Sequence, residues 1–269
     1  MKKIFLGLGA LALAVALVPM FAAFEAHVIN VTAQIENALS VPLDSIDFGT
    51  VFPQEHLDKP LAISLSKSFI DEDRVDDVEY IIRQKPKCGW TNEDGTNLYG
   101  IPTATGHVVV NPQTGATSIE CPDPGNPLRP IGAVYGVLPS LCEYISKEGE
   151  DNNDGTLPSF HKPYIVVLND KGTTDLFDDY YELVWTDTHG RLAKSENDEV
   201  DNWNIDLAVP CFGGYCAQDW ESFVLGINPN ATNTDDYIQP IANEHKVFGC
   251  DLWVEVTEVS EVSEMENGG

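Results

Sequence analysis

Hydrophobic and polar residues alternate in several short stretches of the chain, a pattern typical of half-buried β-strands. In the first stretch, residues 26–35, one face carries the apolar side chains Ile29, Val31, Ala33 and Ile35. The same alternation recurs at residues 61–65, 78–82, 203–209 and 252–257, and weaker strand patterns lie at 43–52, 107–110, 164–168 and 181–185. The turn-rich connections and the absence of a strand–helix–strand rhythm favour antiparallel pairing.

One stretch has the spacing of a helix instead. Trp220, Phe223, Val224 and Ile227 follow one another at intervals of three, one and three residues, which places them on one helical face. Asp219 stands at the position of an N-cap. A second, short helix is expected within residues 139–147.

The alternation breaks down between residues 85 and 163, where prolines and turn dipeptides are frequent. A loop of this length without structure is improbable in a compact domain, so the segment is interpreted as a disulfide-tied insertion. The sequence therefore predicts a mainly β protein, an antiparallel β-sandwich of jelly-roll or immunoglobulin-like type. One amphipathic helix and the loop-rich insertion complete a single domain over residues 23–257, and residues 258–269 form a disordered acidic tail.

The first residues are typical of an export signal. Lys2 and Lys3 precede an uncharged, mostly apolar run from Ile4 to Phe24, and residues 1–22 are interpreted as a signal peptide. The alternative is an uncleaved anchor, because the run is long enough to span a bilayer. Either interpretation exports the remaining chain, so the expected location is extracellular or at the cell surface.

The cysteines agree with export. Their number is even, and the six are Cys88, Cys121, Cys142, Cys211, Cys216 and Cys250. Disulfides are expected in an exported chain, although six cysteines allow about 15 pairings. Cys211 and Cys216 are the favoured pair, because Gly213 and Gly214 between them allow the loop to close. No CxxC motif points to zinc.

Composition narrows the classes of partner. The chain of 269 residues carries 43 Asp and Glu against 15 Lys and Arg, a formal net charge of −28. Phosphate backbones would repel it, so no nucleic-acid partner is expected. Contact with a membrane is expected only through the N-terminal segment, if that segment is not cleaved.

Calcium is the one cofactor that the sequence suggests. Glu150, Asn152 and Asp154 alternate before Gly155, like the first ligands of a calcium loop. His161 stands where an EF-hand has its twelfth-position Glu, so the loop is either a looser calcium site or a solvated acidic turn. The acidic stretches 71–77 and 175–179 are weaker candidates.

No catalytic residue is predicted. The chain contains no HExxH, GxSxG, P-loop or GxGxxG motif, and the protein is expected not to be an enzyme. Among the tryptophans, Trp203 and Trp220 are in phase with core residues. Trp253 lies on the other face of its strand and is the candidate aromatic for stacking on a sugar ring.

Two blocks resemble TasA/camelysin-type secreted bacterial proteins: Ile46-Asp-Phe-Gly-Thr-Val-Phe-Pro53 and Gly249-Cys-Asp-Leu-Trp-Val-Glu-Val256. The resemblance implies a β-sandwich protein of the biofilm matrix or of surface fibres. Camelysin-like members are described as metallopeptidases, whereas this chain contains no recognisable zinc motif to carry that activity.

The sequence therefore favours an exported, non-enzymatic structural protein of the cell surface or extracellular matrix. Its expected partners are further copies of itself or other surface proteins. The strand with Ile29 and Val31 would either pair within its own sandwich or complete the open edge of a neighbour, which would build a fibre. The alternatives are a secreted carbohydrate- or calcium-binding module and a secreted hydrolase or metallopeptidase.

Overall fold

A computed structural model describes residues 35–100, 103–123, 125, 130–149, 156–170 and 179–261. The chain divides into two compact units, Met1–Ile35 and Glu36–Gly269, and the description that follows concerns the second. Its strands are antiparallel, so the predicted mainly β class is confirmed.

The first sheet contains three strands in the order β1 (Leu39–Ser40), β2 (His56–Leu65) and β11 (Val200–Ala208). The predicted alternation decides which faces are buried. Leu61, Ile63 and Leu65 of β2 are buried, as are Trp203, Ile205 and Leu207 of β11. Leu61 pairs with Trp203, so the two apolar rows lie side by side on one face.

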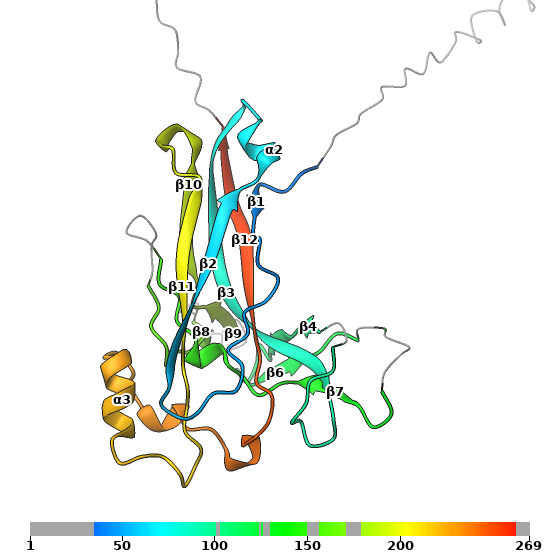
Figure 1. The fold of residues 1–269 in the computed structure, drawn as a ribbon, viewed down its shortest axis with the longest axis vertical. Coiled ribbons are helices and arrows are strands. Elements are labelled where there is room, and N and C mark those ends of the chain that lie inside the picture. The colour runs from blue at the N-terminus through cyan, green and yellow to red at the C-terminus, as the bar shows by residue number, and fades with distance from the viewer. Residues whose placement is uncertain are drawn as a thin grey trace, which may run out of the picture. The chain divides into compact units, whose positions relative to one another are not determined.

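The second sheet is built on β3 (Val75–Thr91), which lies between β10 (Thr188–Ala193) and β12 (Cys250–Glu261). Two short strands, β4 (Ala104–Thr105) and β7 (Val134–Val137), pair with the C-terminal end of β3. Separate hairpins are formed by β5 (His107–Val110) with β6 (Thr117–Glu120) and by β8 (Tyr164–Asn169) with β9 (Tyr180–Trp185). The long strands β2, β3, β11 and β12 are evident in Figure 1.

The predicted helix is confirmed as α3 (Trp220–Ile227), with Trp220 and Val224 buried. Asp219 is its N-cap residue but makes no side-chain capping bond, and Asp219 Oδ1 instead accepts a hydrogen bond from Gln54. A one-turn helix, α2 (Lys67–Ile70), follows β2. The 3-10 helices are η2 (Cys142–Tyr144), η3 (Lys194–Glu196), η4 (Thr234–Tyr237) and η5 (Ile241–Asn243).

Both sheets contribute to one hydrophobic core, which gives a sandwich-like arrangement. At its centre the Tyr80 hydroxyl donates to Asp201 and accepts a hydrogen bond from Trp203 Nε1 at 2.7 Å, and all three side chains are buried. Gly190 of β10 lies against the Tyr80 ring so closely that a Cβ there would overlap it. The buried position of the Tyr80 ring therefore requires a glycine at residue 190 in the neighbouring strand.

Three expectations need correction. Residues 43–52 form no strand, because Gly49 adopts a positive φ of 70° and its N–H is bonded to Asp47 Oδ1. The regular structure does not end at residue 85, where the insertion was expected to begin: β3 continues to Thr91, and Tyr144, Ile145 and Phe160 belong to the shared core. The acidic tail does not begin at residue 258, because β12 continues to Glu261.

Candidate functional site

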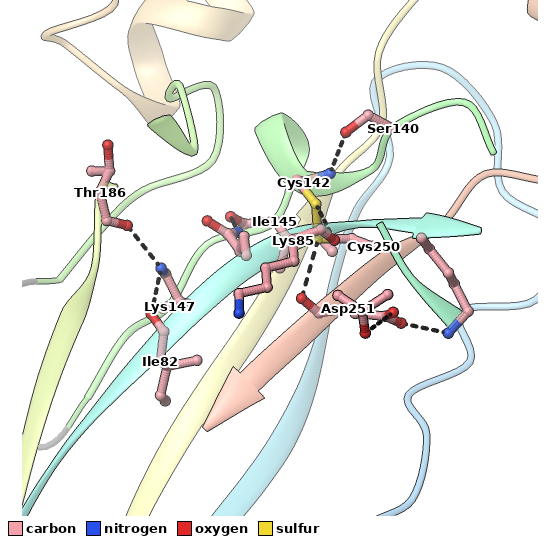
Figure 2. The surroundings of a disulfide bond; sticks show 12 residues. Ile82, Lys85, Ser140, Cys142, Ile145, Lys147, Thr186, Cys250 and Asp251 are labelled. Carbon is pink, nitrogen blue, oxygen red and sulfur yellow. Dashed lines mark hydrogen bonds and ion pairs between the residues drawn. A yellow bond between two sulfur atoms is a disulfide. The ribbon is translucent and has the colours of Figure 1, made fainter. Parts of the chain in front are cut away.

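Three disulfides fix loops that flank the two sheets. The predicted pair Cys211–Cys216 is confirmed, and the other two are Cys88–Cys121 and Cys142–Cys250. Figure 2 shows how Cys142 of η2 meets Cys250 at the first position of β12. Three disulfides fit an oxidising, extracellular setting.

A buried amine lies beside this disulfide. Lys147 is fully buried, and its Nζ donates to the carbonyl oxygens of Ile82 at 3.0 Å and Thr186 at 3.3 Å, as drawn in Figure 2. Burial lowers the pKa of Lys147 to about 8, an effect that nearby Asp187 partly offsets. The sequence does not reveal this lysine, because a single Lys in a loop-rich stretch normally lies at the surface.

The pKa of Lys147 predicts a dependence of stability on pH. The unfolded chain holds the lysine proton up to about pH 10.5, whereas the folded protein releases it near pH 8. The free energy of unfolding should therefore rise between pH 8 and 10.5, by about 3 kcal/mol from this group. Denaturant unfolding of the wild type and of Lys147→Met at pH 7 and pH 10.5 measures this change. The difference in the free energy of unfolding between the two proteins should shift by this amount from one pH to the other. A difference that is independent of pH would contradict the assignment.

His161 and Gln84 extend the buried polar region. His161 Nε2 lies 2.6 Å from Gln84 Oε1, and Gln84 Nε2 donates to the Ile145 carbonyl at 2.8 Å. Burial, together with the charge of Lys147, lowers the pKa of His161 to about 4, and the Pro158 carbonyl acts in the opposite direction. Through Gln84, these hydrogen bonds join β3 to Ile145 and His161.

The outer face of the second sheet carries the predicted ligand aromatic. Trp253 is 42 % exposed, as expected for a strand position that faces outward. The Lys85 ammonium lies 3.9 Å from the centre of its ring, so one face of the indole is already covered. Burial and the neighbouring Arg83 lower the pKa of Lys85. A sugar would have to displace this lysine or stack on the opposite ring face.

Both sheets have an open edge. The Leu65 N–H bonds to the Glu199 carbonyl, so Leu65 and every second residue before it in β2 direct their backbone groups toward β11. The residues between them, Ala62, Pro60 and Asp58, direct their backbone groups away from β11. Pro60 is one of these residues, and the missing N–H of a proline is tolerated only on an unpaired side. In the second sheet, β12 pairs with β3 on one side and with no other described strand.

Residues 41–53, here named the covering segment, reach the core without joining a sheet. Ile46, Phe48 and Val51 pack against the core cluster. In the described part of the chain, no backbone hydrogen bond joins the covering segment to a strand. Because β10 contacts β11, the edges of β2 and β12 lie at the other side of the two-sheet core. The core is therefore closed on this side by side-chain contacts, and the backbone groups of both edges remain available.

A hollow of about 320 Å³ lies beside the start of β2 and the end of β11. Its lining includes His56, Ser146, Glu148, Ser159, Asp206 and Ile227. The serine hydroxyls are engaged in the fold: Ser159 donates to the Tyr144 carbonyl, and Ser146 Oγ accepts from the Asp206 N–H. Among the described contacts, neither hydroxyl is hydrogen-bonded to His56.

Most of the other predicted site residues lie outside the described part of the chain. This applies to the calcium-loop residues Glu150, Asn152 and Asp154, and to Ile29, Val31 and Ala33 of the assembly strand. Ile35 is described and is 93 % exposed. Of the two weaker acidic stretches, 71–77 is described, and its Asp71 pairs with Lys67 at 2.6 Å. Among the described residues, no three His, Cys, Asp or Glu side chains are placed to hold a metal ion.

Comparison with known proteins gives no relative. No family model, no curated protein and no solved structure matches the chain. Within the described residues, no helix is both long enough and apolar enough to cross a bilayer. Any statement about function therefore depends on the chemistry of the chain itself.

Proposed function

We propose that the protein is an exported, non-enzymatic structural subunit of a cell surface or extracellular matrix that assembles with further copies by strand exchange. The observation that carries the proposal is a pair of open edges, one on β12 and one on β2 from Asp58 to Ala62, before the short pairing of β2 with β1. A covering segment lies between core and solvent there and forms no strand pairing. An incoming strand could pair with these backbone groups and replace the side-chain contacts of Ile46, Phe48 and Val51.

The donor in this proposal is the alternating stretch 26–35. Its apolar face would cover the core of the next subunit, and its backbone would pair with an open edge there. Since the donor and acceptor surfaces differ, each added subunit offers a new acceptor, and a filament results. The disulfides would keep the subunit folded outside the cell, and the TasA/camelysin-like blocks agree with a fibre protein.

The acceptor edge can be tested without disturbing the fold. Ala62→Pro removes an N–H that points away from β11, as Pro60 already does naturally. We expect the wild type to form filaments as its concentration rises, and the Ala62→Pro variant to remain a folded monomer. Electron microscopy and light scattering measure assembly, and far-ultraviolet circular dichroism monitors the fold.

The donor strand has a matched control. The variant Ile29→Asp with Val31→Asp places two charges on its apolar face and should abolish filaments while the protein stays soluble. The variant Asn30→Asp with Thr32→Asp places the same charges on the polar face and should still assemble. If the wild type stays monomeric at all concentrations, at acid pH and with added calcium, strand exchange is wrong.

A further inference from the structure

The loop between α3 and η4 contains a motif that the proposed function does not use. Residues 230–232 read Asn-Ala-Thr, which is the acceptor sequence for N-linked sugars, with a residue other than proline at its centre. In the described part of the chain, no other Asn has a Ser or Thr two positions later. The similar stretch Asn30-Val-Thr32 lies outside the described residues.

The fold directs both polar side chains of this motif to the solvent. Asn230 and Thr232 are exposed, whereas Ala231 between them is partly buried and packs against the core cluster. Among the described residues, neither the Asn230 amide nor the Thr232 hydroxyl has a hydrogen-bond partner; only the Asn230 backbone N–H is bonded. Both groups are therefore accessible to an enzyme that acts on the folded or the folding chain.

The residues on either side hold this loop in place. Asn228 is only 6 % exposed; its Nδ2 donates to the Phe160 carbonyl at 2.8 Å, and its Oδ1 accepts from the Asn230 N–H at 3.0 Å. On the other side, Trp220 Nε1 of α3 donates to the Thr234 carbonyl at 3.1 Å. A bulky group on the Asn230 side chain would therefore extend into solvent without displacing a packed side chain.

We propose that Asn230 is a site of N-glycosylation, with a lipid-linked oligosaccharide phosphate as the sugar donor. A bond forms between Asn230 Nδ2 and the anomeric carbon of the sugar, while the bond from that carbon to the phosphate oxygen breaks. The phosphate leaves with the bonding electrons, and one amide proton passes to a base of the transferase, so the step needs neither an oxidant nor a reductant. The Thr232 hydroxyl is the second group that the transferase recognises.

This inference rests on the export that is part of the proposed function, because N-linked sugars are added to exported chains. The three disulfides agree with an exported chain. The inference does not depend on strand exchange, since the loop belongs neither to β2 or β12 nor to the covering segment.

Mass spectrometry of the full chain purified from its native cells tests the proposal. The proteolytic peptide that contains Asn230 should carry the added mass of one or more sugar residues, and its fragment ions should place that mass on Asn230. Asn230→Gln should abolish the added mass. Thr232→Ala should also abolish it, although the acceptor amide is intact, whereas Thr232→Ser keeps the hydroxyl and should retain the glycan.

The matched control is Asn233→Gln, which replaces an exposed Asn of the same loop outside the motif and should leave the glycan in place. Circular dichroism monitors the fold of each variant. An unmodified Asn230 in the wild type, or a Thr232→Ala variant that keeps its glycan, would overturn the proposal. Filaments of a protein without sugar on Asn230 would refute this inference alone, whereas a glycosylated protein that stays monomeric would refute strand exchange alone.

Discussion

Removing the disulfide Cys142–Cys250 should lower the free energy of unfolding by about 5 kcal/mol, the largest effect expected for any of the three disulfides. The bond closes a loop of 108 residues, so its loss releases the most conformational freedom in the unfolded chain. It also ties the first residue of β12 to η2, where Figure 2 shows the buried Lys147 nearby. The variant Cys142→Ala with Cys250→Ala, measured by denaturant unfolding without reductant, tests this.

The other two disulfides are the controls. Cys88–Cys121 spans 33 residues and Cys211–Cys216 spans only 5. Alanine pairs at these positions should lower the free energy of unfolding by about 4 and about 2 kcal/mol, since the entropic effect depends on the logarithm of loop length. A ranking in which the Cys211–Cys216 variant loses the most stability would show that native packing, not loop closure, determines these effects.

Gly190→Ala should destabilise the protein by about 4 kcal/mol, because the new methyl group would occupy the space of the Tyr80 ring. Tyr80 cannot move aside cheaply, since it is fully buried and its hydroxyl is bonded to Asp201 and Trp203. Displacing it would strain the core and break buried hydrogen bonds, each of which contributes about 1 kcal/mol or more. Thermal and denaturant unfolding would measure the loss.

Replacing a second glycine provides a control that distinguishes steric overlap at Gly190 from the general effect of replacing glycine by alanine. At Gly136 of β7, no atom lies within 4 Å of the place that a Cβ would occupy, so Gly136→Ala should change stability little. In a Tyr80→Val background, Gly190→Ala should cost much less than in the wild type, because the overlapping ring is gone. Additive effects of Gly190→Ala and Tyr80→Val would refute the explanation.

The sequence pattern predicted the strands that have one solvent-exposed face and one buried face. Leu61, Ile63 and Leu65 alternate with polar residues because β2 is buried on one side only. By contrast, β10 reads Thr-His-Gly-Arg-Leu-Ala and was not predicted, since Gly190 is needed for the Tyr80 ring and Thr188 is a buried polar residue. Its identity as a strand depends on β3, which lies more than a hundred residues earlier.

The candidate sites were less predictable than the fold. The outward position of Trp253 follows from strand parity, but the Lys85 ammonium over its ring depends on the register of β12 with β3. Likewise, Asp206 looks like an ordinary exposed acid in the sequence, because the alternation of β11 assigns it to the outer face. It is buried because Ser146, Ser159 and the end of α3 lie over that part of the sheet, a contact that no local pattern encodes.

Because β3 lies at the centre of its sheet, its position determines the order in which the strands of that sheet can pair during synthesis. Both strands that flank it, β10 and β12, are synthesised much later, so the emerging chain carries a 17-residue strand whose two sides have no partner yet. Pairings between such distant segments form slowly, and strands that wait for partners tend to aggregate. The local pair Cys211–Cys216 can close early, whereas Cys142–Cys250 must wait for β12. The yield of folded protein should therefore depend on how long β3 stays unpaired before β12 is complete.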